Sequence, residues 1–487
     1  MAGRPGNGAE MFKRRSPDSA KEVLSDPGIR HLLWLAGFFV IGSLALYFFS
    51  IFGFLPQLHN GQGIWNFASD AFEDHILAGF LADRLREGDY SGWWALPVHA
   101  NPAYVKIYSV FYYLLGKSPL SLLPLNAVLY LVVVLMTFSV GKALFSEPVG
   151  LWSAVLVGVL PSFFLQATQS AKDALYIGGQ LLILHAITLL VVKVQNKRTL
   201  SIIAANSMIG LWILWLIRPY MLQLAAFLWL CALVIGVVRG LKGKRQFALS
   251  FGVGAIVLGI FAGVSGSWRY DWSRVLIDSV RGKQFSPDPK IELEYCRKRK
   301  MADNGFCMVG CPRAGRYADV PFCLIMLVEH TRWKFRTTSQ RSATPEAGSN
   351  IGRHVSFQGP GDIFRYVPRA IQIGLAAPFP AMWFSSGQAT EKLGRWIAGV
   401  ETGLMYVGLL LAAFGVWKER RNPAVLLVSF FVFCGITLLG LVVVNIGALY
   451  RQRYIFWFLL IILAVQGFVR LRERPPWSRR AGQERLG

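Results

Sequence analysis

The stretch Asn66–Gly88 reads NFASDAFEDHILAGFLADRLREG and directly follows the loop after the first apolar run of membrane-spanning length. Its alternation of apolar and charged residues predicts an amphipathic helix that lies along a membrane surface. Asp70, Glu73 and Asp74 stand near the start of this helix, within one turn of each other, so their side chains are neighbours. Carboxylates crowded beside a hydrocarbon boundary are energetically costly, which makes this helix the first candidate site.

A helix-capping role is the simpler interpretation of Asp70. With Asp70 as the N-cap and Glu73 three residues later, the pattern resembles a capping box, and Gly88 is typical of a helix end. This interpretation does not account for Asp74. Neighbouring like charges and partial burial raise the pKa of one carboxyl group, which suits a general base.

The composition excludes a soluble globular protein. The chain has 487 residues, of which 54% are hydrophobic and only 16% are charged, against about 25% charged in soluble proteins. The net charge of +24 is interleaved with apolar runs. We therefore assign it to cytoplasmic loops and anionic lipid headgroups, and we expect membrane lipids but no nucleic acid as partners.

The apolar runs predict an all-α polytopic membrane protein with about ten transmembrane helices and additional interfacial helices. The ten expected spans are 32–55, 120–141, 149–168, 174–194, 200–217, 220–238, 247–265, 396–417, 424–447 and 454–470. Shorter apolar pieces at 104–116 and 371–384 are expected to be interfacial or re-entrant helices.

Five regions follow from this pattern. We expect a basic cytoplasmic tail (1–31), a transmembrane module (32–265) that contains the first outer loop (56–103), a large outer loop with a membrane-dipping elbow (266–395), C-terminal transmembrane helices (396–471) and a cytoplasmic tail (472–487). Short basic connections mark the cytoplasmic side and place both termini there. In a bacterium this predicts an inner-membrane protein whose other face is periplasmic.

Four of the six cysteines fall in the large outer loop, whereas the other two fall within spans. An oxidising compartment favours disulfides that staple this loop, and the spacing lacks the paired short Cys-x-x-Cys units and intervening His of a zinc site. The loop cysteines are Cys296, Cys307, Cys311 and Cys323. We predict no cofactor; carboxylates could hold a divalent metal, but no motif supports one.

Several charged residues stand at the expected outer ends of spans. Lys172 and Asp173 occupy one outer turn, where Asp173 offers a second carboxylate and Lys172 a phosphate contact, unless the pair merely begins a helix. Arginines adjacent to spans on the outer side fit an anionic ligand, although turn formation and snorkelling are alternatives. The further candidates for substrate binding are Arg218, Tyr220, Arg365, Arg369, Arg451 and Arg453.

Three stretches carry a resemblance to a known group. They are SDAFEDHILAGFLADRLREGDY (69–90), LPSFFLQATQSAKD (160–173) and LYRQRY (449–454). An acidic residue on an interfacial helix in the first outer loop, followed by many spans and a second acid in the next outer turn, resembles the GT-C membrane glycosyltransferases. Within them the chain is similar to the family related to protein O-mannosyltransferases and aminoarabinose transferase.

The resemblance implies a polyprenyl-phosphate-linked sugar as donor and a lipid, glycan or protein as acceptor. Asp70 would then be the catalytic base and Asp173 a supporting acid, while Lys172, Arg218 and Arg453 would contact the donor phosphate. The family's frequent Asp-Glu pair is here Asp70–Ala71, with Glu73 and Asp74 displaced, so the base remains open among these three acids.

Two other functions are compatible with a multispan chain of this kind. A polysaccharide polymerase or ligase would depend on the arginines of the large loop rather than on Asp70. A transporter or flippase would carry charges or helix breaks at mid-span and often shows repeat symmetry. Here the charges gather at span ends on one side, which argues against the transporter.

Overall fold

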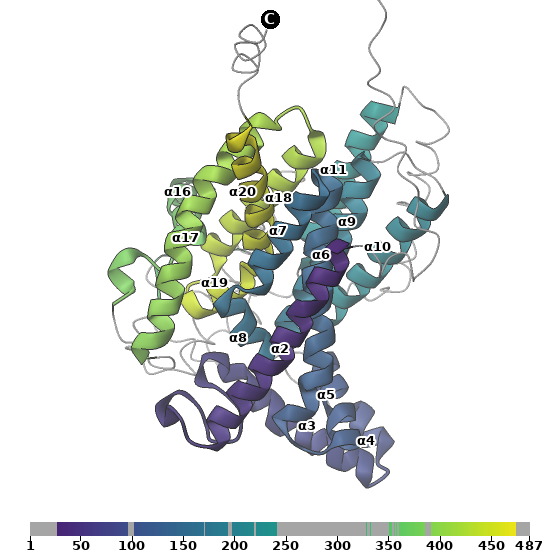
Figure 1. The fold of residues 1–487 in the computed structure, drawn as a ribbon, viewed down its shortest axis with the longest axis vertical. Helices are drawn as coiled ribbons and strands as arrows, with labels where there is room; N and C mark the ends of the chain where they lie inside the picture. Colours follow the sequence, from purple (N-terminus) through teal and green to yellow (C-terminus); the bar gives the residue numbers. More distant parts are fainter. Residues whose placement is uncertain are drawn as a thin grey trace, which may run out of the picture.

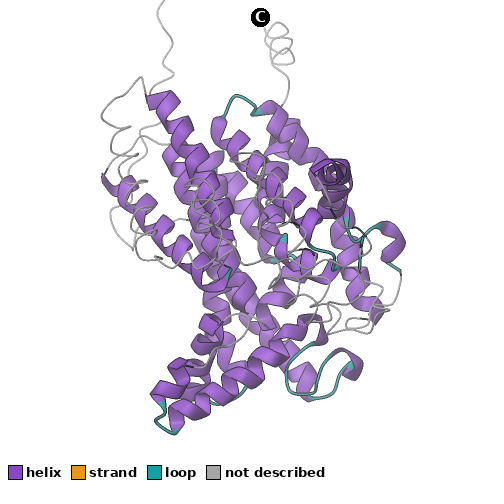
Figure 2. Cartoon of the chain, turned by 180° about the vertical axis from the view of Figure 1, so that it is seen from behind, coloured by secondary structure: helices purple, strands orange, loops and turns teal. Residues whose placement is uncertain are grey.

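The computed structural model describes residues 27–95, 102–169, 171–192, 197–218, 221–240, 350–352, 360–384 and 391–473, with residues 328, 332, 355 and 357. Within these ranges all regular structure is helical (Figure 2). The α-helices are α2 (Pro27–Ile51), α3 (Ser69–Arg86), α4 (Tyr90–Ala95), α5 (Pro102–Leu115), α6 (Leu123–Leu144), α7 (Glu147–Gly158), α8 (Pro161–Gln169), α9 (Ala171–Val192), α10 (Lys197–Ile217), α11 (Met221–Gly240), α16 (Pro360–Ala376), α17 (Glu391–Lys418), α18 (Pro423–Val442), α19 (Ile446–Gln452) and α20 (Tyr454–Arg472).

The protein is a multi-pass helical membrane protein. Seven described helices are long and apolar enough to cross a bilayer, and α7 with α8 gives up to an eighth. Seven of the ten expected spans coincide with these seven helices. The expected span 220–238 corresponds to helix α11, while 247–265 lies outside the described residues.

The expected single span 149–168 is wrong in one respect, because the chain bends there by 63° between α7 and α8. Pro161 is the first residue of α8, and proline supplies no N–H to continue the ladder of α7. The sequence stays apolar through Val159 and Leu160, so hydropathy alone does not reveal the break.

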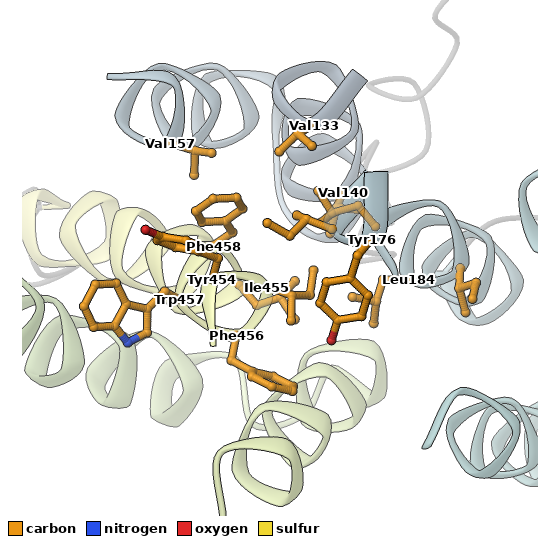
Figure 3. Packing of buried hydrophobic residues seen from close by; sticks show 14 of the residues in the cluster. Val133, Val140, Val157, Tyr176, Leu184, Tyr454, Ile455, Phe456, Trp457 and Phe458 are labelled. Carbon is orange, nitrogen blue, oxygen red and sulfur yellow. The ribbon is translucent and has the colours of Figure 1, made fainter. Parts of the chain in front are cut away.

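Helix α20 lies at the centre of the core. Ile455, Phe456, Trp457 and Phe458 are consecutive and all fully buried, so the first turns of this helix are enclosed on every side, which Figure 3 shows as side chains that radiate toward the surrounding helices. Helices α17 and α20 approach so closely that a Cβ added at Gly467 would overlap a backbone carbonyl of α17. Small residues permit such backbone contact between membrane helices.

Helices α3, α4 and α5 form a group at one end of the bundle (Figure 1). Helix α3 buries Ala78, Leu81 and Ala82 in the main core, whereas Phe72 and Ile76 are exposed on its other side. The N-cap of α3 is Ala68 and makes no side-chain capping bond, so the capping-box interpretation of Asp70 is wrong. Helix α3 ends at Arg86, so the helix end expected near Gly88 is confirmed.

The predicted elbow near residues 371–384 is a helix followed by a turn. Helix α16 ends at Ala376, two residues before Pro378, and a 3₁₀ turn covers Pro380–Met382. The four loop cysteines lie outside the described residues, so their pairing stays a prediction. Cys231 and Cys434 are free thiols, partly buried on α11 and α18.

Candidate functional site

Lys172 is the residue that joins two of the four acids of α3, Asp70 and Asp74. Its Nζ atom lies 3.1 Å from Oδ2 of Asp70 and 3.2 Å from Oδ2 of Asp74. Asp70 and Asp74 are four residues apart on α3, so both carboxylates leave the helix on one side. Lys172 stands in the first turn of α9, and its ammonium also lies over the ring of Tyr104, 5.3 Å from the centroid.

Two arginines complete the arrangement. Nη1 of Arg451, on α19, lies 3.0 Å from Oδ2 of Asp70, although 381 residues separate them along the chain. Nη2 of Arg218, just after α10, lies 2.7 Å from Oδ1 of Asp173. Arg451 is also attracted by Asp173 and repelled by Arg218, so the two pairs are electrostatic neighbours.

These six side chains, three carboxylates and three cations, are named here the charge cluster. Its members are Asp70, Asp74, Lys172, Asp173, Arg218 and Arg451. All six are candidates in the sequence analysis, which predicts that they share the outer side. The structure brings them together from helices α3, α9 and α19 and from the end of α10.

The members of the cluster differ in exposure. The side chain of Asp70 is 42% exposed, whereas that of Asp74 is 11% and that of Asp173 is 3% exposed. The exposed fractions of the three cationic side chains lie between these values, and all three are largely buried. Asp70 is therefore the carboxylate that an approaching molecule meets first.

Asp70 and Asp74 also differ in proton affinity. Burial by itself would raise the pKa of Asp70, but Arg451 and Lys172 hold it well below its usual range. Burial raises the pKa of Asp74 above its usual range, against the opposing influence of Lys172 and of a hydrogen bond donated by the Tyr104 hydroxyl. The sequence predicts one raised carboxyl among these acids, and the structure gives this property to Asp74.

The charge cluster does not include the remaining candidates. Glu73 is exposed on α3, and Arg365 and Arg369 are exposed on α16. Tyr220 lies outside the described residues. Arg453 lies at the turn between α19 and α20, as the sequence predicts, but its side chain is completely buried.

Arg453 packs within the bundle instead. Its guanidinium lies over the ring of Trp457, 4.0 Å from the centroid, and Nη1 donates to the carbonyl of Gly374 at 3.3 Å. Among the described residues, its Nε and Nη2 have no hydrogen-bond partner. Helix α19 ends one residue before Arg453 and α20 begins one residue after it, so the two arginines of LYRQRY point in different directions.

A buried carboxylate that sequence reasoning missed lies in α17. Glu401 is 4% exposed, and its Oε1 accepts the backbone N–H of Ser162 at 2.6 Å. Its other oxygen accepts the hydroxyl of Tyr450. An acid within the apolar range 396–417 was a visible signal, because ionisable residues are rare inside spans. Glu401 caps the first turn of α8, directly after the bend.

A small crevice, with room for about one water molecule, lies between α3, α5 and α8. Its polar lining comes from His75, Tyr108, Tyr112, Thr168 and Gln169. Nδ1 of His75 lies 2.7 Å from the hydroxyl oxygen of Tyr112, which ties α3 to α5. In the part of the chain that the structure describes, no group of three or more His, Cys, Asp and Glu side chains is arranged to hold a metal ion.

The cations of the cluster are suited to binding an anion, whereas the lowered pKa of Asp70 keeps this half-exposed carboxylate ionised. Comparison with known proteins adds no assignment to this geometry: no family model, no curated protein and no solved structure matches the chain.

Proposed function

We propose that the protein is a membrane glycosyltransferase that transfers a sugar from a polyprenyl-phosphate-linked donor to a lipid, glycan or protein acceptor. The observation that carries this proposal is the charge cluster, which combines an exposed carboxylate with three cations at one end of a transmembrane bundle. Such a site offers the two functions that glycosyl transfer requires, a base and an anchor for a phosphate leaving group.

Lys172, Arg218 and Arg451 are the proposed contacts of the donor phosphate. Guanidinium groups bind phosphate oxygens in bidentate geometry, and a lysine adds a compact charge. The complete burial of Arg453 argues against the phosphate role that the resemblance implies for it. Its position under Gly374 and over Trp457 favours a packing role.

Asp70 is the proposed base. The acceptor hydroxyl oxygen forms a bond to the anomeric carbon while the bond from that carbon to the phosphate oxygen breaks, and the phosphate leaves with the electron pair. Asp70 takes the hydroxyl proton. Its exposure makes it the acid that an acceptor can reach, whereas Asp74 and Asp173 hold the neighbouring cations in place.

We further propose that the cluster faces the periplasm of a bacterial inner membrane, with both termini cytoplasmic, since the basic connections lie at the opposite ends of the spans.

Two experiments test the proposal. Mass spectrometry of envelope glycans and lipids from a deletion strain should reveal a missing sugar and thereby name donor and acceptor. In membranes that carry the identified donor, Asp70→Asn should lower transfer by roughly a hundredfold or more, the usual contribution of a general base.

Asp83→Asn is the matched control. Asp83 lies on the same helix, is also 42% exposed and pairs with Lys117 outside the cluster. This variant should transfer at the wild-type rate. Full activity of Asp70→Asn, with normal membrane insertion, would remove Asp70 as the base and would favour a polymerase or ligase that depends on other residues.

A further inference from the structure

We propose that Lys172 and Arg451 form an anion subsite that the Asp70 carboxylate occupies, and that a phosphate-bearing lipid displaces the carboxylate from this subsite. The inference rests on the proposed function and adds a regulatory step to it. The base is masked by the same two cations that later hold the leaving group, and it becomes available when the donor binds.

The geometry carries the first step. Both cations approach the same oxygen: Oδ2 of Asp70 lies 3.1 Å from Nζ of Lys172 and 3.0 Å from Nη1 of Arg451. A carboxylate oxygen held in this way is where a phosphate oxygen would lie. A phosphate group offers several strong acceptor oxygens and bidentate geometry to an arginine, so it competes well against one carboxylate.

Side-chain exposure determines which of the three carboxylates an incoming phosphate displaces. Asp173 is almost completely covered and Asp74 accepts a hydrogen bond from the Tyr104 hydroxyl. Asp70 is the exposed acid, and it lies in the first turn of α3, where its side chain can rotate toward solvent. Of the three acids in the cluster, an incoming anion therefore displaces Asp70.

The two cations remain in place when Asp70 leaves. Lys172 keeps its contact with Asp74 and with the ring of Tyr104. Arg451 keeps the attraction of Asp173. The subsite is therefore pre-formed by residues other than the one that fills it, and a phosphate enters without rearrangement of the helices.

The consequence is a coupling between donor binding and base strength. While Asp70 occupies the subsite, Lys172 and Arg451 suppress the proton affinity of its carboxylate. Once the donor phosphate neutralises these cations, the carboxylate recovers a higher proton affinity beside the anomeric carbon. The base is thus activated only while a donor is bound.

The test measures binding rather than transfer. Isothermal titration of the full-length protein in detergent with polyprenyl phosphate should show that Asp70→Asn binds the lipid more tightly than wild type, by about fivefold, which corresponds to about 1 kcal/mol and to the upper range of a half-exposed ion pair. Arg451→Gln should weaken binding. Asp83→Asn should leave it unchanged, and the uncharged polyprenol should bind all variants equally.

Two safeguards keep the test decisive. Asp70→Ala should reproduce the gain if Asp70→Asn folds poorly, and both proteins are checked for a monodisperse elution profile. Equal or weaker phosphate binding by the Asp70 variants, or binding that does not distinguish phosphate from alcohol, overturns the inference.

The outcome is separable from that of the proposed function. Tighter phosphate binding by Asp70→Asn without detectable sugar transfer by the wild type would support the displacement step and contradict the glycosyltransferase. Sugar transfer by the wild type without a gain in phosphate affinity would support the enzyme and contradict displacement.

Discussion

Replacing Glu401 by alanine tests how the bent helix pair α7 and α8 is held. The carboxylate accepts the N–H of Ser162 at 2.6 Å and the hydroxyl of Tyr450, and it lies near the buried guanidinium of Arg453. The substitution leaves an uncapped helix end, a buried hydroxyl and a buried cation without this carboxylate.

The expected loss of unfolding free energy is about 3–5 kcal/mol, because a hydrogen bond to a charged group contributes about 1.5–3 kcal/mol and an unpaired buried charge costs more. Tyr450→Phe removes one donor and leaves the contact with Ser162, so it should cost about 1–2 kcal/mol. Glu473→Ala is the control: its side chain is 50% exposed in a surface pair with Arg470, and the cost should be at most about 1 kcal/mol.

The assay is denaturant titration in detergent micelles, followed by tryptophan fluorescence, with the three variants measured in parallel. A loss for Glu401→Ala no larger than that for Glu473→Ala would refute the reasoning. It would mean that the bend at Pro161 is fixed by apolar packing alone and that Glu401 has another purpose.

Other changes give equally definite outcomes. Gly467→Val should destabilise the protein by about 1–3 kcal/mol in the same titration, since its side chain would overlap the carbonyl of Leu411; an unchanged midpoint would contradict the close approach of α17 and α20. Tyr104→Phe removes the hydrogen bond that favours ionised Asp74, so the pKa of Asp74 should rise further and the acid limb of the activity profile should move to higher pH; a stationary limb would show that Asp74 need not be ionised. Alkylation under non-reducing conditions should find no free thiols among the four loop cysteines, and labelled thiols there would exclude disulfides.

Part of the charge cluster was predictable because three of its residues stand at the ends of long apolar helices. Alternation of spans brings such ends together, and Lys172, Asp173 and Arg218 follow from that argument alone. The pairing of Asp70 with Arg451 did not follow, because nothing local specifies which of several arginines reaches α3. That choice depends on how α19 is oriented within the bundle.

The failures have local physical causes. Arg453 is only two positions after Arg451 in the sequence, but it lies at the junction of α19 with α20, where its side chain points into the core. Glu401 was overlooked because a single acid in an apolar run indicates burial without naming a partner, and its partners Ser162 and Tyr450 come from distant segments. The bend before Pro161 is masked by uniform hydropathy.

The contact between Asp70 and Arg451 has a consequence for biosynthesis. Helix α3 leaves the ribosome long before α19 is made, because chains are synthesised from the N-terminus at a finite rate. Until α19 has been synthesised, Asp70 on α3 has no contact with Arg451. A chain released before α19 contains most of the described helices but lacks Arg451, so it cannot assemble the complete charge cluster.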